Sequence, residues 1–320
     1  MIQQVVIDKG IPFLEGVFPP EINAIYLSPE EITSEAVREA DALFVRTRTR
    51  INEELLRGSK VRFVATATIG FDHIDQDYCR KEGIHWVSCP GCNAQAVCDY
   101  VEEAISTIKP HKTDLTIGIV GYGNVGKLVA QMAYRHGYRV LLSDPPLGIG
   151  LSLQEIAPQC DVLTFHTPLT HDGEYPTYHL CNADILRLCK PDTLIINAAR
   201  GGVIDEQALH STLNIQHSTF NIKAAIDCWE DEPNINTALL EKVNLASFHI
   251  AGYSIEGKMR ASEMCLRAFC EFFSLPILSI NKKVVPLHGD SESGWIRRIS
   301  ERLKTQPDDF EQLRKQYKLR

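Results

Sequence analysis

The sequence predicts an α/β protein built from two domains, each with a mostly parallel β-sheet. Short apolar runs alternate with helical patterns along nearly the whole chain, which is typical of βα units whose sheet is buried on both faces. The 320 residues also exceed the usual size of one domain. We expect a discontinuous first domain over residues 1–92 and 251–275, a second domain over 93–250, and a short C-terminal extension over 276–320.

The first domain contains four apolar runs with the length and composition of strands. Helix-like stretches lie between them, so the segment reads as one compact α/β unit. The predicted strands are 4–8, 42–46, 62–67 and 85–88, and the predicted helices are 34–40 and 52–57.

A change of pattern after Asn93 marks the second domain. The run AQAVCDYVEEAISTI places apolar residues at helical spacing without Gly or Pro, and a later helical pattern over 254–273 is expected to return the chain to the first domain. Six strands between these helices match the strand number of a dinucleotide-binding fold. The predicted strands are 115–120, 139–144, 162–166, 193–198, 224–227 and 246–250.

The composition excludes several classes of partner. The net charge of -8 argues against binding to a nucleic-acid backbone or to an anionic membrane surface. The N-terminal MIQQVVIDKG lacks a basic stretch followed by an apolar run, and no segment reaches the roughly 18 apolar residues that span a bilayer. We expect a cytoplasmic protein.

The ten cysteines are expected to be reduced thiols, because they are scattered through a long chain without a secretory signal. Cys89 and Cys92 form one CxxC. Since zinc needs about four ligands and no second CxxC or HxxxH follows at finger spacing, no metal site is predicted.

A GxGxxG motif formed by Gly121, Gly123 and Gly126 lies between the strand LTIGIV and the helical run VGKLVAQMAYRHG. In that context the missing side chains let the backbone, including Asn124 and Val125, approach a pyrophosphate, and the helix N-terminus adds partial positive charge. The alternative is that the glycines only pack the helix against the sheet.

The next strand ends in Asp144, eighteen residues beyond Gly126. A carboxylate there accepts hydrogen bonds from ribose hydroxyls and repels a 2′-phosphate, and the following PPLG offers no Arg to bind one. The sequence therefore predicts NAD rather than NADP as the cofactor.

Three further motifs follow late strands of the second domain, where ligands bind in open α/β sheets. Arg200 lies in NAARGGVID, Glu232 in DCWEDEP, and His249 in FHIAGY near the end of the last strand. Oxidation of an alcohol beside a carboxylate needs a cation for the carboxylate and a base for the hydroxyl proton. Arg200 and His249 suit these roles, and Glu232 can hydrogen-bond the second imidazole nitrogen. Each motif alone is also common in turns, loops or cores, but their joint occurrence favours the catalytic interpretation.

The glycine loop, the NxxRGxxxD and DxxxxEP segments and the late His together resemble the D-isomer-specific 2-hydroxyacid dehydrogenases over residues 1–275. The resemblance implies two Rossmann-like domains, a flavodoxin-like substrate domain and an NAD-binding doubly wound parallel sheet. It also implies catalysis by Arg200, Glu232 and His249. Dimer formation through the helix after Asn93 is common in that family, so we expect a homodimer.

Longer segments resemble one branch of the family, the erythronate-4-phosphate dehydrogenases: VRTRTRINEELL, FVATATIGFDHID, PGCNA, LTFHTPLTHDGEYPTYHL and HIAGYSIEGK. This resemblance implies oxidation of 4-phospho-D-erythronate to 2-oxo-3-hydroxy-4-phosphobutanoate, a step towards pyridoxal 5′-phosphate. The implied substrate contacts are Thr47, Thr68 and Tyr253, and the implied cofactor contacts beyond the glycine loop are Asp144, Thr167, Ala199, Asp227 and Gly252.

A basic cluster is the candidate for binding a substrate phosphate. Arg46, Arg48 and Arg50 alternate along the chain, and alternation along a strand would point all three to one face. One or more of them, with Lys258 or Arg260, is expected to contact the phosphate. A solvated basic edge is the alternative.

Other functions remain open at this point. The chain is also compatible with 3-phosphoglycerate dehydrogenase or another D-2-hydroxyacid dehydrogenase, with an NAD-sensing corepressor-like protein, or with a dinucleotide-binding scaffold without turnover. Members of the resembling branch usually carry a C-terminal dimerisation domain. The segment 276–320 is therefore expected to be either a naturally shortened or a truncated form of it.

Overall fold

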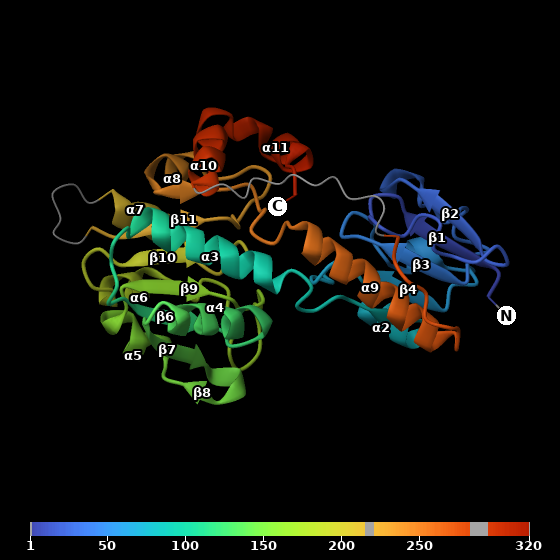
Figure 1. The fold of residues 1–320 in the computed structure, drawn as a ribbon, viewed down its shortest axis with the longest axis horizontal. Coiled ribbons are helices and arrows are strands. Elements are labelled where there is room, and N and C mark those ends of the chain that lie inside the picture. The colour runs from blue at the N-terminus through green and yellow to red at the C-terminus, as the bar shows by residue number, and fades with distance from the viewer. Residues whose placement is uncertain (1, 215–220, 282–293, 320) are drawn as a thin grey trace. The chain divides into compact units, whose positions relative to one another are not determined.

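The computed structural model describes residues 2–214, 221–281 and 294–319, and the chain divides into two compact units (Figure 1). Unit 1 comprises Met1–Asn93 and Ser254–His288, and unit 2 comprises Ala94–Tyr253 and Gly289–Arg320. The chain thus passes from unit 1 to unit 2 twice and returns to unit 1 once in between. The C-terminal helices belong to unit 2, whereas the sequence suggested a separate extension.

Unit 1 is built on a five-stranded parallel sheet of order β2-β1-β3-β4-β5, the flavodoxin-like order that was predicted. The predicted helix at 34–40 is wrong, because that segment forms turns, and strand β2 was missed. The strands are β1 (Gln4–Asp8), β2 (Asn23–Leu27), β3 (Ala42–Val45), β4 (Phe63–Thr66) and β5 (His85–Val87). The helices are η1 (Pro29–Glu31), α1 (Glu53–Leu56), α2 (Gln76–Lys81) and α9 (Ile255–Phe272).

The unit 1 sheet is buried on both faces, because successive strand residues point to opposite sides. Val5 and Phe44 belong to one core cluster and Val6 and Leu43 to another. Helix α9 covers the first face with a stripe that includes Phe269. This arrangement explains why the strands read as continuous apolar runs.

Unit 2 is built on a seven-stranded sheet of order β12-β11-β10-β9-β6-β7-β8, in which only the pairing of β7 with β8 is antiparallel among the described strands. Six parallel strands in this order form a doubly wound dinucleotide-binding sheet, so the predicted fold class is confirmed. The strands are β6 (Thr116–Val120), β7 (Arg139–Asp144), β8 (Ile149–Gly150), β9 (Val162–Phe165), β10 (Leu194–Asn197), β11 (Lys223–Ile226) and β12 (Leu245–Ala246).

The helices of unit 2 form two groups (Figure 1). In one group α3 packs against α4 and α10, and in the other each of the helices α5 to α8 contacts the next one in the chain. Such grouping is expected where both faces of a sheet are covered. The helices are α3 (Ala94–Ile108), α4 (Asn124–Arg135), η2 (Pro145–Leu147), α5 (Leu153–Ile156), η3 (Ala157–Gln159), α6 (Ala183–Leu188), α7 (Glu206–Leu213), α8 (Thr237–Lys242), α10 (Trp295–Thr305), η4 (Pro307–Asp309) and α11 (Phe310–Gln316).

Helix α10 joins unit 2 through apolar and polar contacts. Ile296 and Leu303 are fully buried in the unit 2 core. The Ser300 hydroxyl accepts a hydrogen bond from the Ala246 amide of β12 at 3.0 Å, and Lys304 Nζ donates to the Val243 carbonyl at 2.6 Å. These contacts attach the C-terminal helices to the edge of the sheet that leads to the candidate site.

None of the described helices is long and apolar enough to cross a membrane. All ten cysteines are free and buried, as expected for reduced thiols.

Candidate active site

Three adjacent parallel strands, β10, β11 and β12, lead into the segments that carry the predicted catalytic residues. Arg200 follows β10, Glu232 follows β11, and His249 follows β12. Because the carboxyl ends of parallel strands meet at one edge of the sheet, residues far apart in sequence are brought together there.

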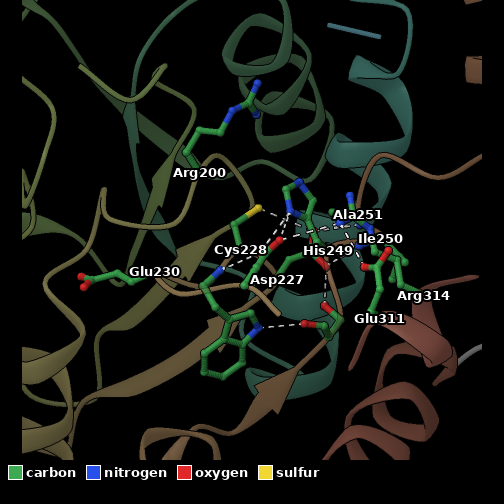
Figure 2. Close-up of polar contacts among 12 residues, drawn as sticks. Arg200, Asp227, Cys228, Glu230, His249, Ile250, Ala251, Glu311 and Arg314 are labelled. Atoms are coloured by element: carbon green, nitrogen blue, oxygen red, sulfur yellow. Dashed lines mark hydrogen bonds and ion pairs between the residues drawn. The ribbon is translucent and has the colours of Figure 1, made fainter. Parts of the chain in front are cut away.

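His249 and Glu232 form a hydrogen-bonded pair. Figure 2 shows the His249 imidazole at the centre of the candidate site. The imidazole Nδ1 lies 2.8 Å from Glu232 Oε2 and 3.0 Å from Oε1, and Oε1 also accepts from the Trp229 amide at 2.9 Å. Burial alone would raise the pKa of Glu232, but the hydrogen bond and charge of His249 and the Trp229 amide outweigh it and lower the pKa. An ionised Glu232 requires Nδ1 to be the donor, so a neutral His249 keeps the lone pair on Nε2.

The prediction that His249 lies near the end of a strand is wrong. Strand β12 ends at Ala246, and His249 lies in the loop beyond it with a φ of +58°. A non-glycine residue in this left-handed region costs about 1–3 kcal/mol, and such a conformation persists only where the surroundings enforce it.

Asp227, directly after β11, holds the loop that carries His249 in this conformation. Its carboxylate is 1% exposed and accepts hydrogen bonds from the amides of Ile250 and Ala251 at 2.8 and 2.9 Å, and from the Ser247 hydroxyl at 2.7 Å. Its carbonyl accepts from the His249 amide at 3.0 Å. The loop is thus held on both sides of the imidazole. This role was not predicted, because sequence analysis assigned Asp227 only a cofactor contact.

Arg200 is positioned by the backbone around it. Asn197 Nδ2 donates to the carbonyls of Arg200 and Cys228 at 2.9 and 3.1 Å, which joins the segment after β10 to the segment after β11. The Arg200 guanidinium donates to the Ala199 carbonyl at 2.8 Å, and in Figure 2 no drawn contact links it to the His249–Glu232 pair. Its role as a carboxylate ligand therefore stays a prediction.

Arg314 of α11 is a site residue that sequence analysis missed. Its Nη1 lies 3.9 Å from Glu232 Oε2, and its Nε donates to the Tyr253 hydroxyl at 3.1 Å (Figure 2 labels Arg314). The guanidinium also lies 5.7 Å from the centre of the Tyr253 ring. No motif marks Arg314, because it comes from the segment beyond the resembling region. It adds positive charge beside the Glu232 carboxylate.

The glycine loop has the close packing that the motif predicts. A Cβ at Gly126 would lie 2.0 Å from the Gly121 carbonyl oxygen, and Gly121 has a φ of +90° and packs against the His166 carbonyl and the Thr167 side chain. At Gly123, the N-cap of α4, a Cβ would meet nothing within 4 Å. The loop therefore leaves open space at the helix N-terminus, where a phosphate binds well.

Comparison with known proteins identifies the family. A model described as "D-isomer specific 2-hydroxyacid dehydrogenase, NAD binding domain" matches residues 100–251. An erythronate-4-phosphate dehydrogenase of Bacteroides thetaiotaomicron is 42% identical over 341 residues, covering 99% of this chain and 96% of that protein. The chain belongs to the D-isomer-specific 2-hydroxyacid dehydrogenase family. It is an NAD-dependent oxidoreductase.

Further relatives agree with this family. The erythronate-4-phosphate dehydrogenase of Azotobacter vinelandii is 40% identical over 309 residues, covering 91% of this chain and 80% of that protein. The TT0316 protein of Thermus thermophilus has a similar fold, with a TM-score of 0.72 at 23% identity over 88% of this chain and 100% of that one. NAD-bound 3-phosphoglycerate dehydrogenase of Entamoeba histolytica has a TM-score of 0.71 at 23% identity, over 86% and 96% of the two chains.

The residues around the dehydrogenase's glycine loop fit NAD. Within the described part of the chain, Thr167 Oγ1 and His166 Nδ1 are buried without a hydrogen-bond partner, although Thr167 packs against Gly121. Burial lowers the pKa of His166 to about 3, so this imidazole is neutral. Buried polar atoms without partners are uncommon and indicate a missing ligand or water. These atoms lie where the cofactor is predicted.

Asp144 links the end of β7 to the glycine loop. Its Oδ2 accepts from the Tyr122 amide at 2.6 Å and its Oδ1 from the Leu147 amide at 3.3 Å. A carboxylate has about four acceptor positions, so ribose hydroxyls can still bind. Ala199 is 8% exposed and Gly252 lies in the turn after the His249 loop. Their cofactor contacts, and that of Asp227, stay predictions.

The Gly126→Ala variant is expected to distort the glycine loop, because the added Cβ would lie 2.0 Å from the Gly121 carbonyl oxygen. We expect the free energy of unfolding to fall by about 2 kcal/mol, measured in urea, and the KM for NAD to rise. The control is Gly123→Ala, which has open space for its Cβ and should change the unfolding free energy by less than about 0.5 kcal/mol. Equal destabilisation by both variants would contradict this account of the loop.

The predicted substrate residues other than Tyr253 belong to unit 1. Thr68 Oγ1 donates to the Gly70 carbonyl at 3.0 Å and lies 2.7 Å from Thr66 Oγ1, while Thr47 is exposed in the turn after β3. Lys258 lies on α9. Their substrate contacts stay predictions.

The expected alternation of three arginines along a strand is wrong. Strand β3 ends at Val45, and the chain turns at residues 47–49. Arg46 Nε and Nη2 donate to the fully buried Asp8 carboxylate at 2.7 and 2.8 Å, so this guanidinium neutralises a core charge. Arg48 and Arg50 are exposed.

A second ionisable cluster lies beside the DCWEDEP loop and was also missed. His179 Nε2 lies 2.8 Å from Glu230 Oε1, and the Glu230 amide donates to Glu206 Oε1 at 2.8 Å. Burial is the main cause that raises the pKa of Glu206 from 4.5 to about 7, and the negative charges of Glu230, Asp231 and Glu232 add to it. The hydrogen bond from the Glu230 amide lowers the pKa but does not outweigh these effects. Glu206 thus titrates near neutral pH.

Replacing Glu206 by Gln should change how stability depends on pH. The fold favours protonated Glu206, so its contribution is fully present below the unfolded pKa of 4.5 and is lost as pH rises through about 7. Relative to Glu206→Gln, the wild type should therefore lose on the order of 3 kcal/mol between about pH 5 and pH 8. Urea unfolding of both proteins across this range tests it. Parallel stability curves would contradict it.

Proposed function

We propose that this dehydrogenase oxidises the C2 hydroxyl of 4-phospho-D-erythronate with NAD, giving 2-oxo-3-hydroxy-4-phosphobutanoate on the route to pyridoxal 5′-phosphate. The main support for this reaction is the 2.8 Å contact of His249 Nδ1 with Glu232, which leaves Nε2 available as a base. The substrate is suggested by relatives at 42% and 40% identity that carry the name erythronate-4-phosphate dehydrogenase.

Each group has one task in this proposal. Bound NAD supplies the acceptor for the hydride that leaves C2. His249 Nε2 takes the hydroxyl proton, and Glu232 stabilises the resulting imidazolium through Nδ1. Arg200 binds the substrate carboxylate through its planar set of donors. Thr47, Thr68 and Tyr253 are proposed as further substrate contacts.

Substrate comparison tests this proposal. Purified protein is mixed with NAD and 4-phospho-D-erythronate, 3-phosphoglycerate or D-lactate, and NADH formation is followed by absorbance. We expect turnover of the first acid and little of the other two. Equal activity on all three would reject the substrate while leaving the family unchanged.

The phosphate of this substrate is proposed to bind near the turn after β3. Arg48→Gln is expected to raise the KM for the phosphorylated acid about 10-fold, with little change in kcat. The reason is that one charge-assisted hydrogen bond to the phosphate is lost. Arg46 is a poor choice for this test, because its loss would leave the buried Asp8 carboxylate uncompensated. Arg80→Gln, an exposed arginine of α2, is the control. An unchanged KM in Arg48→Gln would exclude this arginine as the phosphate ligand.

We also propose that the protein is a cytoplasmic homodimer that associates through α3, as is common in the family. Light scattering of the purified protein gives the mass of the assembly directly. A monomeric mass at working concentrations would reject the dimer.

A further inference from the structure

One cluster of side chains in unit 2 combines a thiol, an imidazole and a carboxylate, the three kinds of group that bind zinc in proteins. The ligand atoms of Cys228, Glu232 and His249 all lie within 4.8 Å of one another. Figure 2 shows the Cys228 sulfur beside the His249 imidazole. We propose that these three side chains bind Zn²⁺, and that the bound ion blocks oxidation of the hydroxy acid.

The geometry is close to that of a zinc site. Zinc lies about 2.0–2.3 Å from N, O and S ligands, so tetrahedral ligand atoms are roughly 3.3–3.8 Å apart. His249 Nδ1 and Glu232 Oε2 are now 2.8 Å apart, and every pair in the set is within 4.8 Å. Shifts of about 1 Å or less therefore suffice to place an ion between them.

The chemistry of the set selects the metal. One thiol, one imidazole and one carboxylate suit a borderline-soft ion such as Zn²⁺, whereas Mg²⁺ and Ca²⁺ require mainly oxygen ligands. Three protein ligands leave a fourth position for water. Within the described part of the chain, the Cys228 thiol makes only one long hydrogen bond, to Asp227 Oδ2 at 3.9 Å. Little hydrogen bonding is therefore lost when a metal replaces its proton.

The ligands are held before any metal arrives. The Trp229 amide fixes Glu232, and the Trp229 indole donates to the Ser247 carbonyl at 2.9 Å, which anchors the loop that also carries Cys228. The side chains of His249 and Glu232 are 30% and 18% exposed, whereas Cys228 is 1% exposed. An ion therefore enters past the imidazole and the carboxylate and meets the sulfur as its innermost ligand.

Zinc at Nδ1 would remove the base that the proposed function requires. The neutral imidazole keeps one proton, which moves from Nδ1 to Nε2 when the metal takes Nδ1. The thiol proton passes to solvent, so one proton is released for each ion bound. With a proton on Nε2, His249 cannot accept the hydroxyl proton of the substrate. Only this inhibition rests on the proposed function, whereas metal binding does not.

Direct binding measurements test the site without substrate. The reduced full-length protein is titrated with Zn²⁺ in a calorimeter, and with Co²⁺ while near-ultraviolet absorbance is recorded. We expect one ion per chain, one proton released as shown by buffers of different ionisation heat, and a thiolate-to-cobalt charge-transfer band. Cys228→Ser should weaken Zn²⁺ binding about 100-fold or more and abolish the cobalt band.

The matched control is Cys189→Ala, which removes an equally buried thiol of unit 2 and should leave both signals unchanged. Cys228→Val serves as a second variant if the serine variant unfolds, as judged by circular dichroism. Unchanged zinc affinity in folded Cys228 variants, or no zinc binding to the reduced wild type, overturns the proposal. If zinc binds without loss of turnover, the metal site is supported but its inhibitory effect is rejected.

Discussion

The His249→Gln variant is expected to lose about 10³-fold in kcat for hydroxy-acid oxidation while still binding NAD, because it removes the proposed base and leaves the glycine loop intact. Gln can still donate a hydrogen bond to Glu232, so the loop geometry should be kept. The rate is measured by NADH absorbance at saturating substrate, and NAD binding by calorimetry. The control is His136→Gln, which breaks another His–carboxylate pair of unit 2, that with Glu102, and should leave kcat within about 2-fold.

The same pair gives a test of how Glu232 acts. If Glu232 works through the imidazole, Glu232→Gln lowers kcat in the wild-type background but has little further effect beside His249→Gln. The double mutant then resembles the single His249 variant. Independent, multiplicative losses from the two substitutions would contradict an action of the carboxylate through His249.

The Asp227→Asn variant is expected to lose about 3 kcal/mol of unfolding free energy, although the side chain hardly changes in size. The carboxylate accepts three hydrogen bonds in a fully buried position. An amide in its place turns an N–H towards the backbone amide of Ile250 or Ala251, and one buried donor is then left without an acceptor. Because those amides follow His249, kcat should fall as well.

Urea unfolding and kcat measured on the same preparation check this expectation. Asp231→Asn is the matched control, since Asp231 lies in the same loop but is exposed, and its stability should change by less than about 0.5 kcal/mol. A stable Asp227→Asn protein with wild-type kcat would show that the carboxylate does not hold the His249 loop.

Much of the fold could be predicted from the sequence because buried parallel strands are continuous apolar runs. The strands that lead to the site, β10 and β11, were found within one or two residues. The edges of the sheets were harder. Strand β2 is only partly buried, and β8 has two residues, so neither has a long apolar signal. The segment 34–40 has helix-forming residues but forms turns, because helix propensity is only a weak guide to structure.

The site was partly predictable for a different reason. Residue type and order identified Glu232 and His249, whose hydrogen bond is present. Sequence could not show that Asp227 is turned inward to hold the backbone after His249, because the same residue type also suits a ribose or amide contact. Arg314 could not be predicted as a site residue, because its contact with Tyr253 depends on the packing of α11 rather than on a local motif.

The placement of Arg200, Glu232 and His249 in the segments that follow three neighbouring strands has an evolutionary consequence. Adjacent strands are about 4.8 Å apart, so the sheet itself sets the spacing of the three segments. The segments also support one another across strands, since Asn197 donates to the Cys228 carbonyl and Asp227 accepts from the amides that follow His249. A lineage that exchanges one segment is therefore expected to need compensating changes in the other two.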